Sequence, residues 1–220
     1  MASDELAHVL SLLSHELRGP LGVIRGYLRL LEQTGPELSD QHRQAVSAAL
    51  KASDRAVELL TQTSMLAQLE RDETPFDFTP VALKELLSGA VEGLALPDDP
   101  AVRLEIGDVP TAMMAADRTL LGGAIATLVS AVAKAQAREA TVKIVCEEQG
   151  RHGVAGVLIT IAADSSSATS AERALDIARG GLGLDLPVAQ HLITRHRGDL
   201  RELQDGDRFA GMLVWLPTTS

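Results

Sequence analysis

The fold of the first third of the chain is decided by residues 6–32, which read LAHVLSLLSHELRGPLGVIRGYLRLLE. Apolar residues recur there in alternating steps of three and four, at Leu6, Leu10, Leu13, Leu17, Leu21, Ile24, Leu28 and Leu31. This heptad spacing predicts a helix that packs against other helices in a bundle. A second helical pattern covers residues 41–69, after a short break at Thr34-Gly35-Pro36. Two helices joined by so short a loop are expected to lie antiparallel.

The two expected helices leave apolar surface for a partner. Each would be roughly 40 Å long at about 1.5 Å per residue, and each has only the other helix to cover its apolar stripe. A symmetric homodimer that closes a four-helix bundle is the expected solution. A monomer in which the C-terminal part of the chain covers the hairpin is the alternative that the pattern leaves open.

The remainder of the chain reads as a mixture of helices and strands. The charged, proline-ended stretch Arg71–Pro75 is the expected boundary, so we predict a helical domain over residues 1–72 and a second domain over residues 76–220. Helical patterns there cover residues 83–94, 117–135 and 183–196, and strand-like runs cover residues 102–106, 141–147, 156–162, 199–203 and 209–216. These elements predict an α/β sandwich of one sheet covered by helices, and an α+β class for the whole chain.

The composition argues against several classes of partner. A formal net charge of −10 would repel nucleic acid and acidic lipid headgroups. The single cysteine, Cys146, cannot form an internal disulfide. No apolar run approaches the length needed to cross a bilayer, and the start of the chain lacks the basic flank of a signal peptide. We therefore expect a cytoplasmic protein with no nucleic acid partner and no insertion into a membrane.

One histidine of the first helix has the setting of a reactive group. His15 is turned about 200° from the nearest residues of the apolar stripe, at about 100° per residue, so it is expected to be exposed. A neutral imidazole there can attack a phosphoryl group with one ring nitrogen while Glu16 holds the N–H of the other. Arg18 places a positive charge nearby, and Pro20 should bend the helix and leave the carbonyl of Glu16 without its helical donor. Taken alone, this arrangement is more readily explained by an ordinary surface histidine than by a reactive one.

The residues around His15 carry a family resemblance. The run Ser14–Leu21, SHELRGPL, closely resembles the phosphoacceptor box of sensor histidine kinases. The resemblance extends through the second helix and implies a dimerisation and histidine-phosphotransfer domain, with His15, Glu16 and Arg18 as its catalytic residues and a response regulator receiver domain as its partner. The family usually has Thr or Asn where this chain has Gly19, and that side chain positions the water that dephosphorylates the regulator. Because Gly19 cannot hold a water by its side chain, the resemblance implies phosphotransfer more securely than phosphatase activity.

The second domain resembles the ATP-binding domain that follows this hairpin in histidine kinases. The clearest match is Gly180–Ala189, GGLGLDLPVA, which is similar to the family's glycine-rich box at the start of a helix. Glycines at a helix N-terminus let backbone N–H groups approach phosphate, so Gly181 and Gly183 are candidate nucleotide contacts. Asp164 follows a strand, where the family places the aspartate that recognises adenine.

Other parts of that resemblance are missing. Thr127 and Ala131 stand where the family has asparagines, and an alanine methyl supplies no oxygen ligand to Mg²⁺. Ser166 and Ala168 replace the glycines that normally follow the adenine-binding aspartate. We therefore predict that this domain binds ATP badly or not at all, and we expect no cofactor and no metal site.

Three functions remain after these observations. The first is a histidine phosphotransferase of a phosphorelay, which takes a phosphoryl group from one receiver-domain aspartate and gives it to another through His15. The second is an autophosphorylating kinase, the one function here that requires ATP and Mg²⁺. The third is a non-catalytic adaptor that binds a receiver domain or a kinase. The intact histidine box and the incomplete nucleotide site favour the first.

Overall fold

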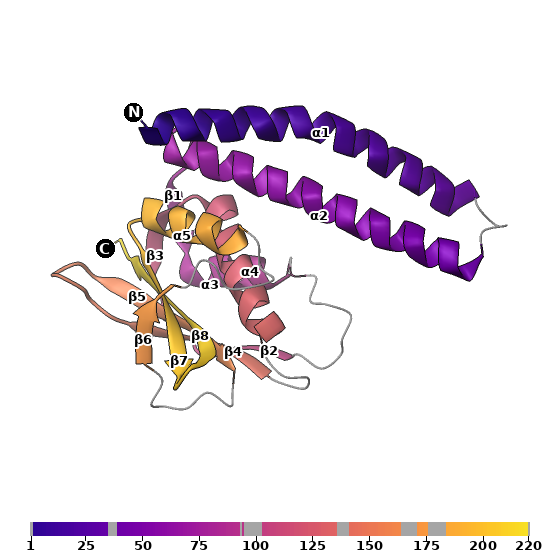
Figure 1. Cartoon of the computed structure of the whole chain (residues 1–220). Helices are drawn as coiled ribbons and strands as arrows, with labels where there is room; N and C mark the ends of the chain where they lie inside the picture. The colour runs from indigo at the N-terminus through magenta and orange to yellow at the C-terminus, as the bar shows by residue number, and fades with distance from the viewer. Residues whose placement is uncertain are drawn as a thin grey trace. The chain divides into compact units, whose positions relative to one another are not determined.

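The computed structural model describes residues 2–34, 39–92, 94, 103–135, 141–163, 171–175 and 184–219. The chain divides into two compact units, Met1–Pro75 and Phe76–Ser220, and the division falls at the end of the proline-ended stretch 71–75. Helices are the only regular secondary structure in the described part of the first unit, whereas the second combines helices with β-sheet (Figure 1). The α+β class predicted from the sequence is thus confirmed.

The first unit is a pair of long helices, α1 (Ala2–Thr34) and α2 (Asp40–Glu70), that lie side by side and antiparallel, as predicted (Figure 1). Ser39 is the N-cap of α2, and its hydroxyl accepts a hydrogen bond from the backbone N–H of His42 at 3.4 Å. This contact satisfies one of the free N–H groups of the first helical turn. Arg25 of α1 and Asp54 of α2 form an exposed ion pair at 3.5 Å, which identifies the side of α1 that faces α2.

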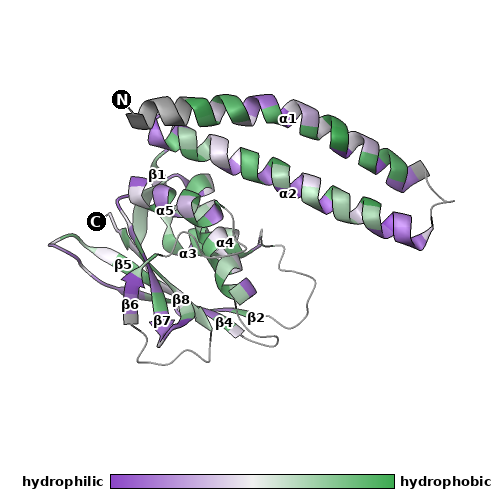
Figure 2. Ribbon diagram, in the orientation of Figure 1, coloured by the Kyte–Doolittle hydropathy of each residue, from purple (hydrophilic) through white to green (hydrophobic). Residues whose placement is uncertain are grey.

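Helix α1 carries more apolar surface than the hairpin covers. Leu21 and Leu28 lie on the same side as Arg25 at helical steps of four and three, and both are half-buried. Nine large apolar side chains of α1 are exposed by 45 % or more: Val9, Leu12, Leu13, Leu17, Val23, Ile24, Tyr27, Leu30 and Leu31. The hydropathy colouring shows green residues at intervals along the coloured part of α1 (Figure 2). About half of the predicted apolar stripe is therefore open on a single hairpin.

The second unit is built on a six-stranded sheet with strand order β2-β4-β5-β8-β7-β6. Its strands are β2 (Arg103–Ile106), β4 (Thr141–Glu148), β5 (Gly156–Ala163), β6 (Ala171–Ala174), β7 (Asp199–Asp205) and β8 (Arg208–Pro217). Neighbouring strands are antiparallel, except that β2 and β4 are parallel. A separate antiparallel pair joins β1 (Thr79–Ala82) to β3 (Met113–Ala116).

Three helices complete the second unit: α3 (Leu83–Glu92), α4 (Arg118–Ala135) and α5 (Asp185–Arg195). Helix α4 is central, because it contacts α3 and α5 as well as strands β4, β5 and β8. The core between these helices and the sheet is closed by fully buried aliphatic side chains, among them Leu121, Ile125, Leu128, Ile144, Ile159, Ile161 and Leu186. Alternation along β5 places every second residue in this core, as expected for a sheet with one covered face.

Helix α4 corrects one expectation from the sequence. Its 18 residues are long and apolar enough to cross a membrane by length and composition, although no apolar run was expected to reach that limit. In this fold α4 is a core helix, and nine of its residues are buried against the neighbouring elements. Its apolar character is accounted for by that packing.

The longer predicted elements all exist, with ends that differ by a few residues. The three predicted helices of the second unit correspond to α3, α4 and α5, and the five predicted strands to β2, β4, β5, β7 and β8. Three four-residue strands, β1, β3 and β6, were not predicted. Two of them form their own small sheet, so the unit does not consist of one sheet alone.

Candidate functional site

The candidate site is on the surface of α1, around His15. The side chain of His15 is 81 % exposed and that of its neighbour Glu16 is 79 % exposed. His15 is turned by about 160–200° from Leu13, Leu17 and Ile24 at about 100° per residue. The imidazole therefore projects away from these three residues of the apolar stripe, and the prediction that it is exposed is confirmed.

The two ring nitrogens of His15 have different surroundings. Nδ1 lies 3.6 Å from Oε1 of Glu16, close enough for electrostatic attraction but longer than a hydrogen bond. A carboxylate on that side favours the tautomer with the proton on Nδ1, since it stabilises an N–H that points toward it. Nε2 then keeps its lone pair and faces solvent. This arrangement leaves Nε2 of His15 as the ring nitrogen with a lone pair, on a side chain that is 81 % exposed.

The residues that follow His15 keep its surroundings open. Arg18 is exposed and lies nearly one helical turn further along α1, on a neighbouring part of the surface. A Cβ added at Gly19 would meet nothing within 4 Å, and helical side chains lean toward the N-terminus, so the missing side chain leaves space beside His15. Helix α1 continues through Pro20, whose nitrogen cannot donate to the carbonyl of Glu16. An exposed helical surface thus carries a base, a carboxylate, a cation and a free carbonyl within two turns.

The structure brings together the three residues that the sequence placed at the catalytic site, His15, Glu16 and Arg18. The three candidate nucleotide contacts, Asp164, Gly181 and Gly183, lie outside the described residues. Thr127 and Ala131 are described on α4, where Thr127 is half-buried and Ala131 is 2 % exposed. Among the described residues, no group of three or more His, Cys, Asp or Glu side chains could hold a metal ion.

A buried polar pair in the second unit was not predicted. Nε2 of His196 accepts the backbone N–H of Asp117 at 3.0 Å, and Nδ1 donates to the carbonyl of Leu192 at 2.7 Å. Both ring nitrogens are therefore used by a neutral imidazole. Burial lowers the pKa of His196 below its usual value, so the neutral form is favoured.

Asp117 itself ties the start of α4 to the beginning of the unit. Its Oδ1 accepts the backbone N–H of Leu120 at 2.9 Å, which caps the helix, and its Oδ2 accepts the backbone N–H of Asp77 at 3.1 Å. Burial alone would raise the pKa of Asp117, but the backbone N–H groups that it accepts, that of Leu120 first, lower it overall. No local pattern in the sequence links Asp117 to His196, because 79 positions separate them.

Comparisons with known proteins place these features in a family. The model of the His Kinase A (phospho-acceptor) domain matches residues 5–72, which contain the whole site around His15. Over 211 residues the chain is 29 % identical to the phosphate regulon sensor protein PhoR of Pseudomonas aeruginosa, an alignment that covers 91 % of this chain and 46 % of PhoR. The chain thus spans about half the length of this curated relative.

Solved structures share the fold over nearly the whole chain. Full-length ShkA in complex with AMPPNP matches with a TM-score of 0.69 and 21 % identity, covering 97 % of this chain and 46 % of ShkA. The histidine kinase AdeS of Acinetobacter baumannii matches with a TM-score of 0.62 and 15 % identity, covering 94 % of this chain and 98 % of the AdeS chain. Together with the exposed histidine in its phosphoacceptor box, the match of residues 5–72 and the similarity to PhoR support a protein of the sensor histidine kinase family, and the solved structures show that the fold is shared.

Proposed function

We propose that the chain is a histidine phosphotransferase of two-component signalling. His15 takes a phosphoryl group from the aspartyl phosphate of one receiver domain and delivers it to the aspartate of another. The observation that carries this proposal is the exposed imidazole of His15, with Nδ1 facing the carboxylate of Glu16 at 3.6 Å and Nε2 open to a partner. A cytoplasmic location remains a prediction that rests on composition.

The proposed transfer is a direct displacement at phosphorus. The lone pair of Nε2 attacks the phosphorus atom, the P–N bond forms, and the P–O bond to the aspartyl carboxylate breaks. The electron pair of that bond leaves with the carboxylate, so no proton is needed by the leaving group. The imidazole becomes cationic, and Glu16 stabilises the charge through the N–H on Nδ1. Reversal of the same step returns the phosphoryl group to a second aspartate.

Arg18 and Gly19 favour this step because they accommodate the incoming phosphoryl group and the receiver domain that carries it. A phosphoryl group in transfer carries negative charge on its equatorial oxygens, and the guanidinium of Arg18 is a cation within reach of the same surface. The open space at Gly19 lets the backbone of a receiver domain approach α1 closely. The same absence of a polar side chain argues against an efficient phosphatase activity toward the regulator.

The functional unit is proposed to be a homodimer. Nine large apolar side chains of α1 are at least 45 % exposed in the single chain, which is more apolar surface than one soluble helix usually leaves open. Pairing two hairpins through this face would close a four-helix bundle. His15 would remain outside an interface centred on Leu13, Leu17 and Ile24, because it is turned by about 160–200° from these residues.

The proposed transfer requires neither ATP nor Mg²⁺. Ala131 stands where an oxygen ligand to Mg²⁺ is expected in the family, and its methyl group is 2 % exposed within the core. Thr127, the other replacement for an asparagine, is half-buried on the same helix. These residues favour delivery of the phosphoryl group by another protein.

An autophosphorylating kinase is the second candidate. It is favoured by the fold that the chain shares with ShkA, whose structure was determined in complex with AMPPNP, and by the similarity to the PhoR sensor protein. In that case nucleotide bound near the glycine-rich stretch would phosphorylate Nε2 of His15. The third candidate, a non-catalytic adaptor, would bind receiver domains without accepting phosphate.

One labelling experiment separates the three functions. The chain is incubated with a panel of ³²P-phosphorylated receiver domains, and separately with γ-labelled ATP and Mg²⁺. We expect label to pass from a receiver domain to the chain and to His42→Gln, which changes another exposed histidine of the hairpin, but not to His15→Gln. Label on His15 from ATP would establish the kinase. Binding of receiver domains with no transfer of label would leave the adaptor.

A further inference from the structure

The second unit contains a pocket that the proposed phosphotransfer does not use. It has a volume of about 900 Å³ and is formed by the C-terminal end of α5, the turn into β7, the turn between β4 and β5, and the end of β8. Its lining contains four arginines, Arg151, Arg195, Arg197 and Arg201, together with His152 and the neutral imidazole of His196, and the one carboxylate in its lining is that of Asp199. A strongly cationic pocket therefore occurs in a chain whose net charge is −10.

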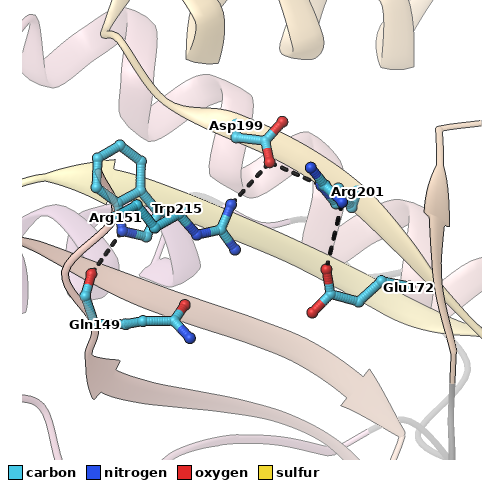
Figure 3. Close-up of polar contacts among 6 residues, drawn as sticks. All are labelled: Gln149, Arg151, Glu172, Asp199, Arg201 and Trp215. Carbon is cyan, nitrogen blue, oxygen red and sulfur yellow. Dashed lines mark hydrogen bonds and ion pairs between the residues drawn. The ribbon is translucent and has the colours of Figure 1, made fainter.

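The carboxylate of Asp199 is shared between two arginines. Its Oδ2 accepts from Nη1 of Arg151 at 2.8 Å and from Nε of Arg201 at 2.9 Å, and both side chains converge on it (Figure 3). A second carboxylate, that of Glu172, lies 3.7 Å from Nη1 of Arg201. Each guanidinium has five N–H groups, so these few contacts leave donors available for a ligand.

Aromatic side chains line the pocket beside the arginines. The ring of Trp215 is held by its N–H, which donates to the carbonyl of Gln149 at 2.7 Å, and the guanidinium carbon of Arg151 lies 5.7 Å from the ring centroid (Figure 3). On another side, Phe78 lies edge-on to the imidazole of His196 at 5.1 Å between ring centroids and is about half exposed. Cationic groups and aromatic surface thus line one space.

Two residues of the lining are held in a backbone conformation that side chains rarely adopt. Arg197 has φ of 59° and His152 has φ of 50°, both in the left-handed region that favours glycine. Glycine is the least strained residue at such a position. His152 lies with Gly153 in the two-residue turn between Arg151 and Val154, and Arg197 follows the C-cap of α5, so both conformations belong to turns that place these residues in the pocket lining.

We propose that this pocket binds a small organic anion, in which a phosphate or carboxylate group is attached to an aromatic or other apolar body. Arginine forks match the planar, bidentate geometry of both anions, and the aromatic walls would contact the body of the ligand. The volume is in the range of small-molecule sites, which favours a small ligand over a macromolecule. The pocket is at the C-terminal end of α5, about 16 Å along this 11-residue helix from its first residue, Asp185, which follows the glycine-rich stretch in the sequence.

The only tryptophan of the chain lines this pocket, which gives a direct assay. The full chain is titrated with phenyl phosphate, benzoate, inorganic phosphate and phenol, and the fluorescence of Trp215 is followed together with the heat of binding. We expect phenyl phosphate or benzoate to bind more tightly than inorganic phosphate or phenol. The comparison of phenyl phosphate with benzoate then shows which anionic group is preferred.

Two arginine variants test the site. Arg197→Asn removes the guanidinium while keeping a residue that tolerates the left-handed conformation, and it should weaken binding about tenfold or more, as expected for a lost charge-assisted hydrogen bond. Arg208→Asn removes an exposed arginine outside the lining and should leave the affinity unchanged. Equal weakening in both variants would show a non-specific charge effect and overturn the proposal. No response of Trp215 and no heat at millimolar concentrations of either aromatic anion would also overturn it.

Discussion

The most direct test of the helical hairpin is to place a charge on the exposed face of α1. Ile24 is 50 % exposed in the single chain, and in the proposed homodimer this exposed half would be covered by the partner. Full burial of an isoleucine side chain contributes about 1.5–3 kcal/mol, so half of it contributes about 0.8–1.5 kcal/mol. A symmetric dimer contains two copies, so Ile24→Lys should cost about 1.5–3 kcal/mol before any cost of burying the lysine charge. The dimer Kd should rise by roughly 10- to 150-fold.

Sedimentation velocity over a series of protein concentrations measures this change. Lysine has a helix propensity at least as high as that of isoleucine, so the hairpin of Ile24→Lys should remain helical by circular dichroism. Gln33→Lys is the matched control, because it introduces the same charge at an exposed position of α1 outside the apolar face. A wild-type chain that is monomeric at all concentrations would refute the reasoning, as would equal effects of the two substitutions.

Contacts within the second unit lead to three further predictions. Below about pH 6.5 the free energy of unfolding should fall by up to about 1.4 kcal/mol for each unit by which the pH is lowered, since the lowered pKa of His196 lets the unfolded state bind the proton more readily. Urea titrations at several pH values measure this dependence, and it should be smaller in His196→Gln. Asp117→Ala removes the acceptor of two backbone N–H groups and should cost about 1–2 kcal/mol in thermal unfolding, so an unchanged midpoint would count against the cap. Gly156→Ala places a Cβ 2.5 Å from the ring of Trp215 and should destabilise by about 1–3 kcal/mol, whereas Gly123→Ala, whose Cβ meets nothing within 4 Å, should stabilise by up to about 1 kcal/mol.

The hairpin and its histidine were predictable because their determinants are local. The periodicity of residues 6–32 fixes the helix, and His15, Glu16 and Arg18 fall on its exposed surface by helical geometry alone. The sequence alone did not indicate which residues of the apolar stripe face α2 and which stay exposed. Leu28 turns toward α2 and Ile24 does not, a difference that depends on where the second helix packs.

Short strands were missed because their sequences carry little information of their own. Strand β3 is Met113–Ala116, which contains no β-branched residue, and β1 contains Pro80, which is unfavourable in a strand interior. Both are strands because they pair with each other, in the register that joins Val81 to Met114. Pairing between segments more than 30 positions apart is a tertiary effect that four residues cannot encode.

The buried pair of Asp117 and His196 and the arginine-rich pocket depend on the same long-range assembly. In the sequence, Arg151 is isolated from Arg197 and Arg201, and nothing in the intervening residues indicates that they meet. The antiparallel pairing of β5 with β8 and of β8 with β7 brings the β4–β5 turn to the start of β7. Sequence reasoning therefore singled out a group of residues that lies on one helix and missed the pocket that is assembled from several elements.

The proline inside α1 determines where this helix bends most easily. A helix resists bending through its backbone hydrogen bonds, and Pro20 removes the one that would end at the carbonyl of Glu16. The two halves of α1 run in different directions (Figure 1). Helix α1 thus bends most easily within about one turn of His15. A force applied to either end of the helix therefore changes the orientation of the surface that carries the imidazole.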